Sequence, residues 1–191
     1  MASPTEILQR VRPLAEYPAL AERAAVLLSE PKSMVQLTLA EARLVTARMG
    51  LVTFPAGSTL LREGAESASG HMLLLLEGEV SVDSHGEVAA VALSVISQGE
   101  IIGEMALLDG APRSASCTAV SPVQAAGLSR RGFEELMAEN PVVAAKLVVV
   151  LATRIADRLR AVSQQVHVYA QLAAERSEEL HRLKRSSAGA D

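Results

Sequence analysis

The chain contains one cysteine, no tryptophan and few aromatic residues of any kind. Only 2% of its 191 residues are aromatic while 49% are hydrophobic, so aliphatic side chains and methionine must form the core. Because Cys117 has no second cysteine to pair with, a disulfide within the chain is excluded, and we expect a reducing compartment. The length suits one domain with an appendage better than two complete domains.

The sequence also lacks a basic excess and a long apolar run. A net charge of −4 argues against a general electrostatic attraction to nucleic acid. The longest apolar run, residues 142–152, contains Lys146 and is too short to span a bilayer. Residues 1–18 carry scattered charges rather than the apolar segment of a signal peptide. We therefore expect a cytoplasmic protein with no membrane association and, at most, a local anion site.

The hydrophobic pattern changes period twice along the chain. Up to Gly50, apolar residues at helical spacing are interrupted by prolines, which indicates several short helices, and Thr38 with Glu41 forms a capping box for one of them. From residue 51 to 128, short apolar runs alternate with glycine and proline turns, which predicts a sandwich, jelly roll or small barrel. The expected strands are residues 51–54, 71–76, 79–82, 88–96, 116–120 and 123–128.

The third part of the sequence is helical. Ser129 precedes a short helix, and Asn140-Pro141 begins a long one that continues to about Arg185. Residues at spacings of three and four form a seam that is apolar except at Arg176: Leu159, Val162, Val166, Tyr169, Ala173, Arg176, Leu180 and Leu183. This seam is typical of a coiled coil, so we expect a homodimer, the alternative being a helix that folds back on its own domain.

The segment 103–116, GEMALLDGAPRSAS, gathers residues suited to an anion. Gly103 permits close backbone approach, and the helix start that follows it offers N–H groups. The planar fork of Arg113 matches two phosphate oxygens, and Glu104 can accept hydrogen bonds from sugar hydroxyls. The pattern predicts a socket for a sugar phosphate. The alternative is a surface loop in which Arg113 pairs with Glu104.

This segment resembles the phosphate-binding cassette of the cyclic nucleotide-binding domain family, G-E-(L/M)-(A/G)-L followed by a short loop and R-(S/T/A)-A. The matching positions are Gly103, Glu104, Met105, Ala106, Leu107, Pro112, Arg113, Ser114 and Ala115. The turn motifs at residues 54–57, 62–64 and 76–80 and the Asn-Pro pair at 140–141 also resemble the family, so the resemblance covers roughly residues 35–165.

The resemblance implies an α+β fold: an eight-stranded antiparallel β-roll, or double-stranded jelly roll, with N-terminal helices and a long C-terminal helix. On this basis residues 1–50 are an N-terminal helical region, and residues 51–128 are the β-roll with its cassette at 99–116. Residues 129–185 form the hinge and a long lid or dimerisation helix. Residues 186–191, small and polar, are expected to be a disordered tail.

The resemblance also assigns roles within the cassette. It implies that Glu104 binds the ribose 2′-hydroxyl and that Arg113 binds the cyclic phosphate. Backbone N–H groups of Gly103, Ser114 and Ala115 would complete the anion cradle.

The purine base is expected between the roll and the long helix. Met105 and Ala106 belong to the cassette helix beside the ligand. Arg158, Val162 and Ser163 are the expected lid residues on the long helix.

The function that follows is a receptor module for cAMP rather than cGMP, whose C-terminal helix moves on binding and signals to a protein effector in trans. Few residues follow Val162, so we expect no winged helix-turn-helix and no direct DNA binding. The alternative is a ligand-free pseudo-receptor that serves as a dimeric scaffold. The sequence contains no metal-ligand cluster and no recognisable nucleophile or general base, so we expect neither an enzyme nor a cofactor.

Overall fold

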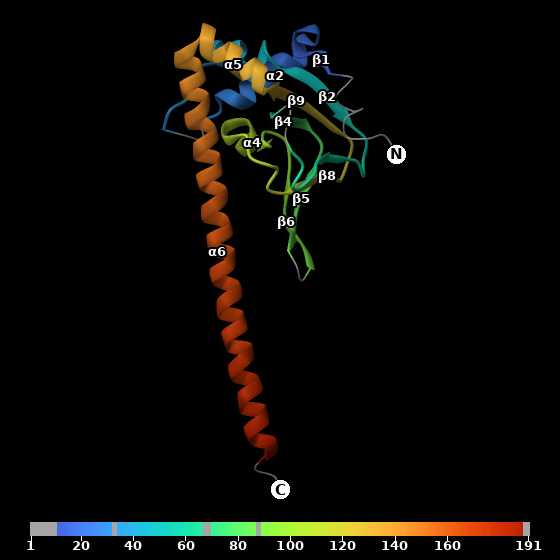
Figure 1. The fold of residues 1–191 in the computed structure, drawn as a ribbon, viewed down its shortest axis with the longest axis vertical. Coiled ribbons are helices and arrows are strands. Elements are labelled where there is room, and N and C mark those ends of the chain that lie inside the picture. The colour runs from blue at the N-terminus through green and yellow to red at the C-terminus, as the bar shows by residue number, and fades with distance from the viewer. Residues whose placement is uncertain (1–10, 32–33, 67–69, 87–88, 189–191) are drawn as a thin grey trace. The chain divides into compact units, whose positions relative to one another are not determined.

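The computed structural model describes residues 11–31, 34–66, 70–86 and 89–188 (Figure 1). These residues belong to two compact units. The first unit runs to Leu151 and contains all the strands described below, and the second begins at Ala152 and continues the last helix.

The N-terminal part of the first unit is largely helical, as predicted. It contains η2 (Leu14–Glu16), α2 (Pro18–Ser29) and α3 (Leu39–Thr46). The predicted capping box is confirmed: the Glu41 N–H donates to Thr38 Oγ1 at 3.2 Å, and the Thr38 N–H donates to Glu41 Oε2 at 2.8 Å. A two-residue strand that the pattern did not indicate, β1 (Arg12–Pro13), precedes these helices.

The strands form two antiparallel sheets. Their bounds are β2 (Gly50–Phe54), β3 (Thr59–Leu61), β4 (His71–Glu77), β5 (Val80–Gly86), β6 (Ala89–Ile96), β7 (Ile101–Ile102), β8 (Ser116–Ala119) and β9 (Val123–Ser129). The first sheet has the order β1-β2-β9-β4-β7, and the second has the order β3-β8-β5-β6. This arrangement confirms the expected α+β fold. Two short strands among β2–β9, β3 and β7, were not indicated by the sequence pattern.

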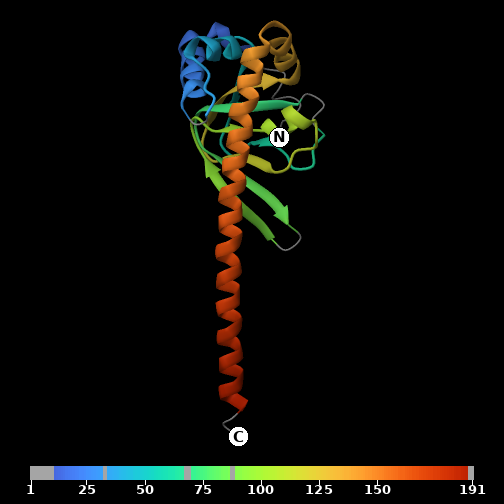
Figure 2. The ribbon, with the colours of Figure 1, turned by 90° about the vertical axis from the view of Figure 1, so that its left-hand side faces the viewer.

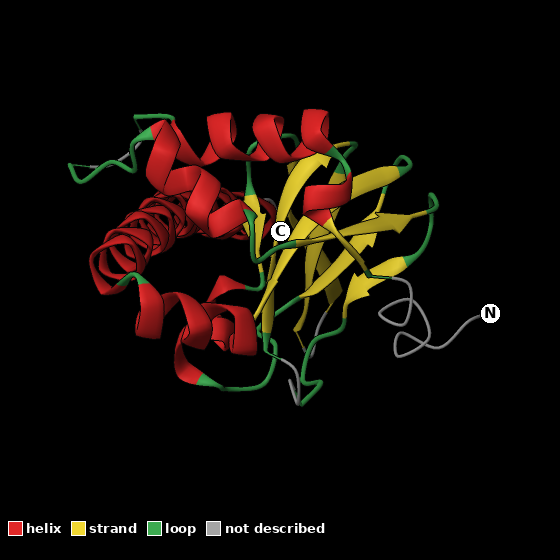
Figure 3. Ribbon diagram, turned by 90° about the horizontal axis from the view of Figure 1, so that it is seen from above, coloured by secondary structure: helices red, strands yellow, loops and turns green. Residues whose placement is uncertain are grey.

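Strand β4 separates two hydrophobic cores. Met72, Leu74 and Leu76 pack into a core shared with the helices, whereas Leu73 and Leu75 pack into the core between the two sheets. Successive side chains of a strand point to opposite faces, so a strand that is buried on both faces must be apolar throughout. Helices α2 and α5 (Arg130–Glu139) cover the face of the first sheet that belongs to the helical core (Figures 1 and 3).

Two helices follow the last strand, and their starts agree with the predictions. The Ser129 hydroxyl accepts a hydrogen bond from the Gly132 N–H at 3.1 Å and so caps α5. Helix α6 (Pro141–Ala188) then begins at the expected proline. Its first turns belong to the helical core, and Lys146 donates to Glu41 Oε1 at 2.6 Å.

The second unit is a single uninterrupted helix over its described residues (Figure 2). Leu159, Val166 and Tyr169 of the predicted seam are each more than 60% exposed. The helix continues to Ala188, three residues past the predicted end, so residues 186–188 of the expected tail are helical instead, because serine and alanine permit a helix to continue. Residues 189–191 lie outside the described part of the chain. Within that part, no helix is both long enough and apolar enough to cross a membrane.

Candidate functional site

Gly103 joins β7 to the short helix α4 (Glu104–Asp109) in a conformation that requires glycine. Its φ is +75°, in the left-handed region. A Cβ placed here would lie 2.6 Å from Arg113 Nη1 and 2.8 Å from the His71 carbonyl oxygen. In this structure, the groups close to Gly103 are the side chain of Arg113 and the backbone of His71, and the approach of a ligand to Gly103 stays a prediction.

The guanidinium of Arg113 is held at both terminal nitrogens. Nη1 donates to the Gly103 carbonyl oxygen at 2.8 Å, and Nη2 lies 3.4 Å from His71 Nδ1. Its backbone is also fixed, because its N–H donates to the Ala65 oxygen at 3.2 Å and its carbonyl accepts from the Gly64 N–H at 2.8 Å. Arg113 is only 7% exposed, so the structure places a permanent cation inside the first unit.

Glu104, the first residue of α4, is buried too, with 2% of its surface exposed and its Oε2 atom inaccessible to solvent. Burial lowers the pKa of the Arg113 guanidinium, and the nearby Cys117 thiol and Glu104 carboxylate oppose that change. A buried cation beside a buried carboxylate can bind a ligand that carries both an anion and hydroxyl groups, since electrostatic interactions strengthen where water is excluded.

His71, at the start of β4, is a site residue that sequence reasoning missed. Burial, and secondly the charge of Arg113, lower the pKa of its imidazole to about 4, so the ring is neutral at pH 7. In the sequence it is only a polar residue before an apolar run, 42 positions from Arg113. No local pattern reports a contact over that separation.

Arg130 is a second residue that the sequence analysis did not single out. Its Nη2 donates to the carbonyl oxygen of Ala106 in α4 at 2.7 Å, and its backbone N–H donates to the Gly70 oxygen at 2.7 Å. A Cβ at Gly70 would lie 3.0 Å from Arg130 Nε. Arg130 therefore connects the beginning of α5 directly to the cassette helix.

The remaining predicted cassette residues have different environments. Ala106 is buried, Met105 and Ser114 are exposed, and Ala115 is half-buried. The Ser114 hydroxyl lies 3.7 Å from Met105 Sδ. The cassette thus presents Met105 and Ser114 outward while Glu104 and Arg113 remain inside.

The predicted lid residues lie on α6 in the second unit. Arg158 is half-buried, and Val162 and Ser163 are exposed. Their contact with a purine base stays a prediction.

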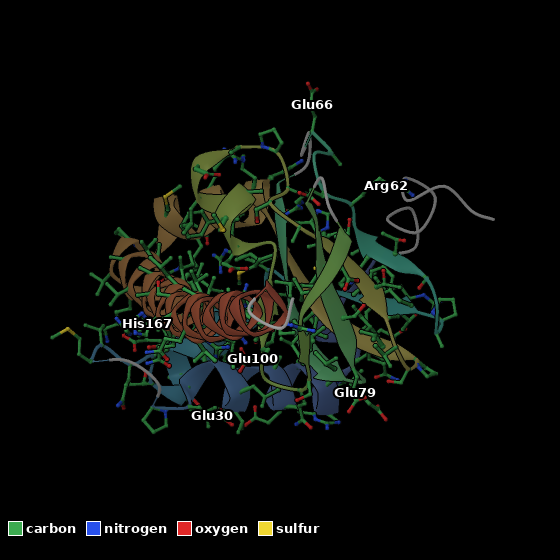
Figure 4. The ribbon with its side chains drawn as sticks, turned by 90° about the horizontal axis from the view of Figure 1, so that it is seen from below. Glu30, Arg62, Glu66, Glu79, Glu100 and His167 are labelled. Carbon is green, nitrogen blue, oxygen red and sulfur yellow. The ribbon has the colours of Figure 1, made fainter. Side chains whose placement is uncertain are left out.

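A separate polar hollow of about 600 Å³ lies against the second sheet. Its lining residues are Thr59, Arg62, Glu63, Asp83, Ser116 and Thr118. Along β8, Ser116 and Thr118 alternate with Cys117, which is part of the core between the sheets, so the hollow opens on the outer face. Nearby, Glu66 points away from the sheets (Figure 4).

Among the described residues, no group of three or more His, Cys, Asp or Glu side chains could hold a metal ion.

Comparison with known proteins shows what this region is similar to. Residues 51–140 match the family model of the cyclic nucleotide-binding domain. A solved structure of a cyclic nucleotide-binding domain from Methylobacillus flagellatus is 28% identical, with a TM-score of 0.74 over 83% of this chain and 86% of that one.

Curated relatives resemble part of the chain. The cAMP-dependent protein kinase regulatory subunit of Aspergillus fumigatus is 38% identical over 87 residues, which are 45% of this chain and 20% of that protein. The CRP-like cAMP-activated global transcriptional regulator of Mycobacterium tuberculosis is 25% identical over 112 residues, or 58% of this chain and 49% of the relative. The match therefore spans a fifth to a half of the length of these relatives.

Proposed function

From the premise that residues 51–140 are a cyclic nucleotide-binding domain, we propose that this protein is a receptor for a cyclic nucleotide, and for cAMP rather than cGMP. The observation that carries the proposal is the buried Arg113, held by Gly103 beside the buried Glu104. The preference for cAMP is supported by the two curated relatives above, both of which are described by their dependence on cAMP or activation by it.

In the proposed complex, Arg113 binds the cyclic phosphate through charge-assisted hydrogen bonds. Glu104 accepts a hydrogen bond from the ribose 2′-hydroxyl. Backbone N–H groups of Gly103, Ser114 and Ala115 complete the anion cradle, with Met105 and Ala106 beside it. This assignment gives the buried charge of Arg113 an anionic partner and gives the buried carboxylate of Glu104 a hydroxyl donor.

The signal is proposed to leave through the C-terminal helix. Binding shifts an equilibrium toward a state in which Arg158, Val162 and Ser163 close over the purine, and the ligand can shift it only by its differential affinity for that state. The exposed seam residues Leu159, Val166 and Tyr169 support a homodimer, and a protein effector in trans would detect the change.

Calorimetric titration of the full chain with cAMP, cGMP and 5′-AMP tests the proposal. We expect cAMP to bind most tightly and Arg113→Gln to lose about 2–4 kcal/mol of binding free energy, or roughly 30- to 1,000-fold in affinity, because a partly buried, charge-assisted contact is removed. Arg62→Gln is the matched control, since Arg62 is an exposed arginine on the nearby segment that ends in Gly64. It should bind as the wild type does.

The other outcomes would contradict the proposed site or the proposed function. An Arg113→Gln variant that binds cAMP as tightly as the wild type would contradict the assigned site. A wild-type protein that neither binds a cyclic nucleotide nor gains thermal stability from one would instead favour the ligand-free scaffold. Conversion of cAMP to AMP during incubation, detected by chromatography, would reveal an enzyme.

A further inference from the structure

The ring of His71 lies close to Arg113, and its backbone lies close to Gly103. Its Nδ1 lies 3.4 Å from Arg113 Nη2, and its carbonyl oxygen would lie 2.8 Å from a Cβ at Gly103. Because His71 belongs to β4, which pairs with β7 at Leu73 and Ile102, its position relative to Gly103 is fixed by the first sheet. The imidazole is thus held by the sheet and not by a loop.

The two contacts of Arg113 fix the orientation of its guanidinium. A guanidinium has five N–H donors in one plane and no acceptor. One donor of Nη1 is used by the Gly103 oxygen and one of Nη2 points to the imidazole, so the orientation of the plane is set by a partner at each terminal nitrogen. Without the imidazole, Nη2 loses this partner, and the guanidinium plane can turn about the Cδ–Nε bond.

We propose that His71 is a positioning residue for the anion site. As a neutral imidazole, His71 accepts at Nδ1 a hydrogen bond from Arg113 Nη2 and thereby orients the guanidinium toward a cyclic phosphate. The role rests on the cyclic nucleotide function proposed above. Since an arginine can only donate, Nδ1 must carry no proton, and the ring proton must reside on Nε2.

The charges around His71 favour this neutral form. Arg113 faces it from the segment before β8, and Arg130 of α5 approaches the neighbouring Gly70. Glu104 of α4 and Cys117 of β8 interact with Arg113. Burial, and secondly the charge of Arg113, hold the pKa of His71 near 4, so the acceptor persists over the physiological range of pH.

Titration of the full chain with cAMP tests the role through matched variants. His71→Leu removes the acceptor and should weaken cAMP binding by about 10- to 100-fold, whereas His71→Asn, whose side-chain oxygen can stand near the position of Nδ1, should retain most of the affinity. In an Arg113→Gln background, His71→Leu should have no further effect, because His71 acts through that arginine. Additive losses would overturn the proposal.

A spectroscopic measurement tests the ring in the wild-type protein without a ligand, and a variant serves only to assign the signal. Nitrogen-15 correlation spectra of the imidazole, with His71 assigned by its disappearance in His71→Asn, should show Nδ1 unprotonated and Nε2 protonated, with no titration between pH 8 and pH 6. A proton on Nδ1, or titration within that range, would overturn the proposal.

The two proposals fail in different ways. A wild-type protein that does not bind any cyclic nucleotide overturns the proposed function. A wild-type protein that binds cAMP while His71→Leu binds it equally well overturns only the role of His71.

Discussion

Two glycines of the β-roll share nearly the same backbone conformation but differ in their surroundings. Gly103 has a φ of +75° and Gly57 has a φ of +78°. A Cβ at Gly57 would meet no atom within 4 Å, whereas one at Gly103 would overlap Arg113 Nη1 and the His71 oxygen. Alanine substitutions at these two glycines therefore distinguish the free-energy cost of a positive φ from the additional cost of steric overlap with Arg113 and His71.

Gly103→Ala should therefore destabilise the protein more than Gly57→Ala and should also abolish cAMP binding. We expect Gly57→Ala to lower the free energy of unfolding by about 1–2 kcal/mol, as for an alanine in the left-handed region. Gly103→Ala should lose about 1–3 kcal/mol more through steric overlap. Urea titration and calorimetry of both variants measure this difference, and equal stabilities with unchanged binding in Gly103→Ala would contradict the described contacts.

The residues of the cassette could be predicted because they are close in sequence and differ in kind from their surroundings. A glycine, an acid and an arginine within a short loop already indicate a sugar phosphate site. His71 and Arg130 could not be predicted, since each reaches the cassette only through sheet pairing or helix packing. Their roles depend on tertiary distances that one sequence does not contain.

At the scale of elements, ion pairs join the N-terminal helices to one another and to the start of α6. Lys146 of α6 contacts Glu41 of α3, and Arg43 of α3 contacts Glu22 of α2 at 2.7 Å. The first pair is the less exposed of the two. Hydrogen bonds from Lys146 and then from the Thr38 backbone lower the pKa of Glu41 to about 2 from 4.5.

Glu41→Gln should lower the melting temperature at pH 7, and the difference from the wild type should shrink in acid. Because the pKa is depressed in the folded state, the charge of Glu41 stabilises the fold above pH 4.5, and this contribution is lost as the pH falls toward about 2. Glutamine can still form the capping box, so the variant removes the charge of Glu41 while keeping this hydrogen-bonding pattern.

Melting curves measured from pH 7 to pH 3 check this dependence. Glu22→Gln is the control and should have a smaller effect, because exposed ion pairs contribute little. A Glu41→Gln variant whose difference from the wild type stays constant with pH would show that charge is not the cause.

Elements with a repeated pattern could be predicted, and elements without one could not. The strands β2, β4 and β9 follow from short apolar runs between turns, and the caps at Thr38 and Ser129 follow from capping residues. The two-residue strands β1 and β7 are too short to show a period. Their pairing is imposed by the longer strands beside them.

At the scale of the whole molecule, the exposed residues Leu159, Val166 and Tyr169 of the α6 seam lead to a testable assembly. If a second copy covers it, Val166→Glu should convert a dimer into a monomer, because a charge would be buried at the centre of the seam. Gln165→Glu, at the adjacent exposed position, adds the same charge outside the seam and should leave the dimer intact.

Sedimentation equilibrium of the two variants and the wild type measures the assembly directly. A wild-type protein that remains a monomer at every concentration would contradict the dimer. The spacing of the apolar residues could be predicted from the sequence, but the partner that covers them could not, since an apolar stripe has the same appearance whatever packs on it.

Strand β4 has a consequence for how the first unit melts. Met72, Leu74 and Leu76 belong to the helical core, while Leu73 and Leu75 belong to the core between the sheets. Because β4 contributes side chains to both cores, neither core can unfold without the loss of β4 from the other. The helices and the β-roll should therefore unfold in one cooperative step, and a ligand that binds only in the roll should raise the unfolding temperature of the helices by the same amount.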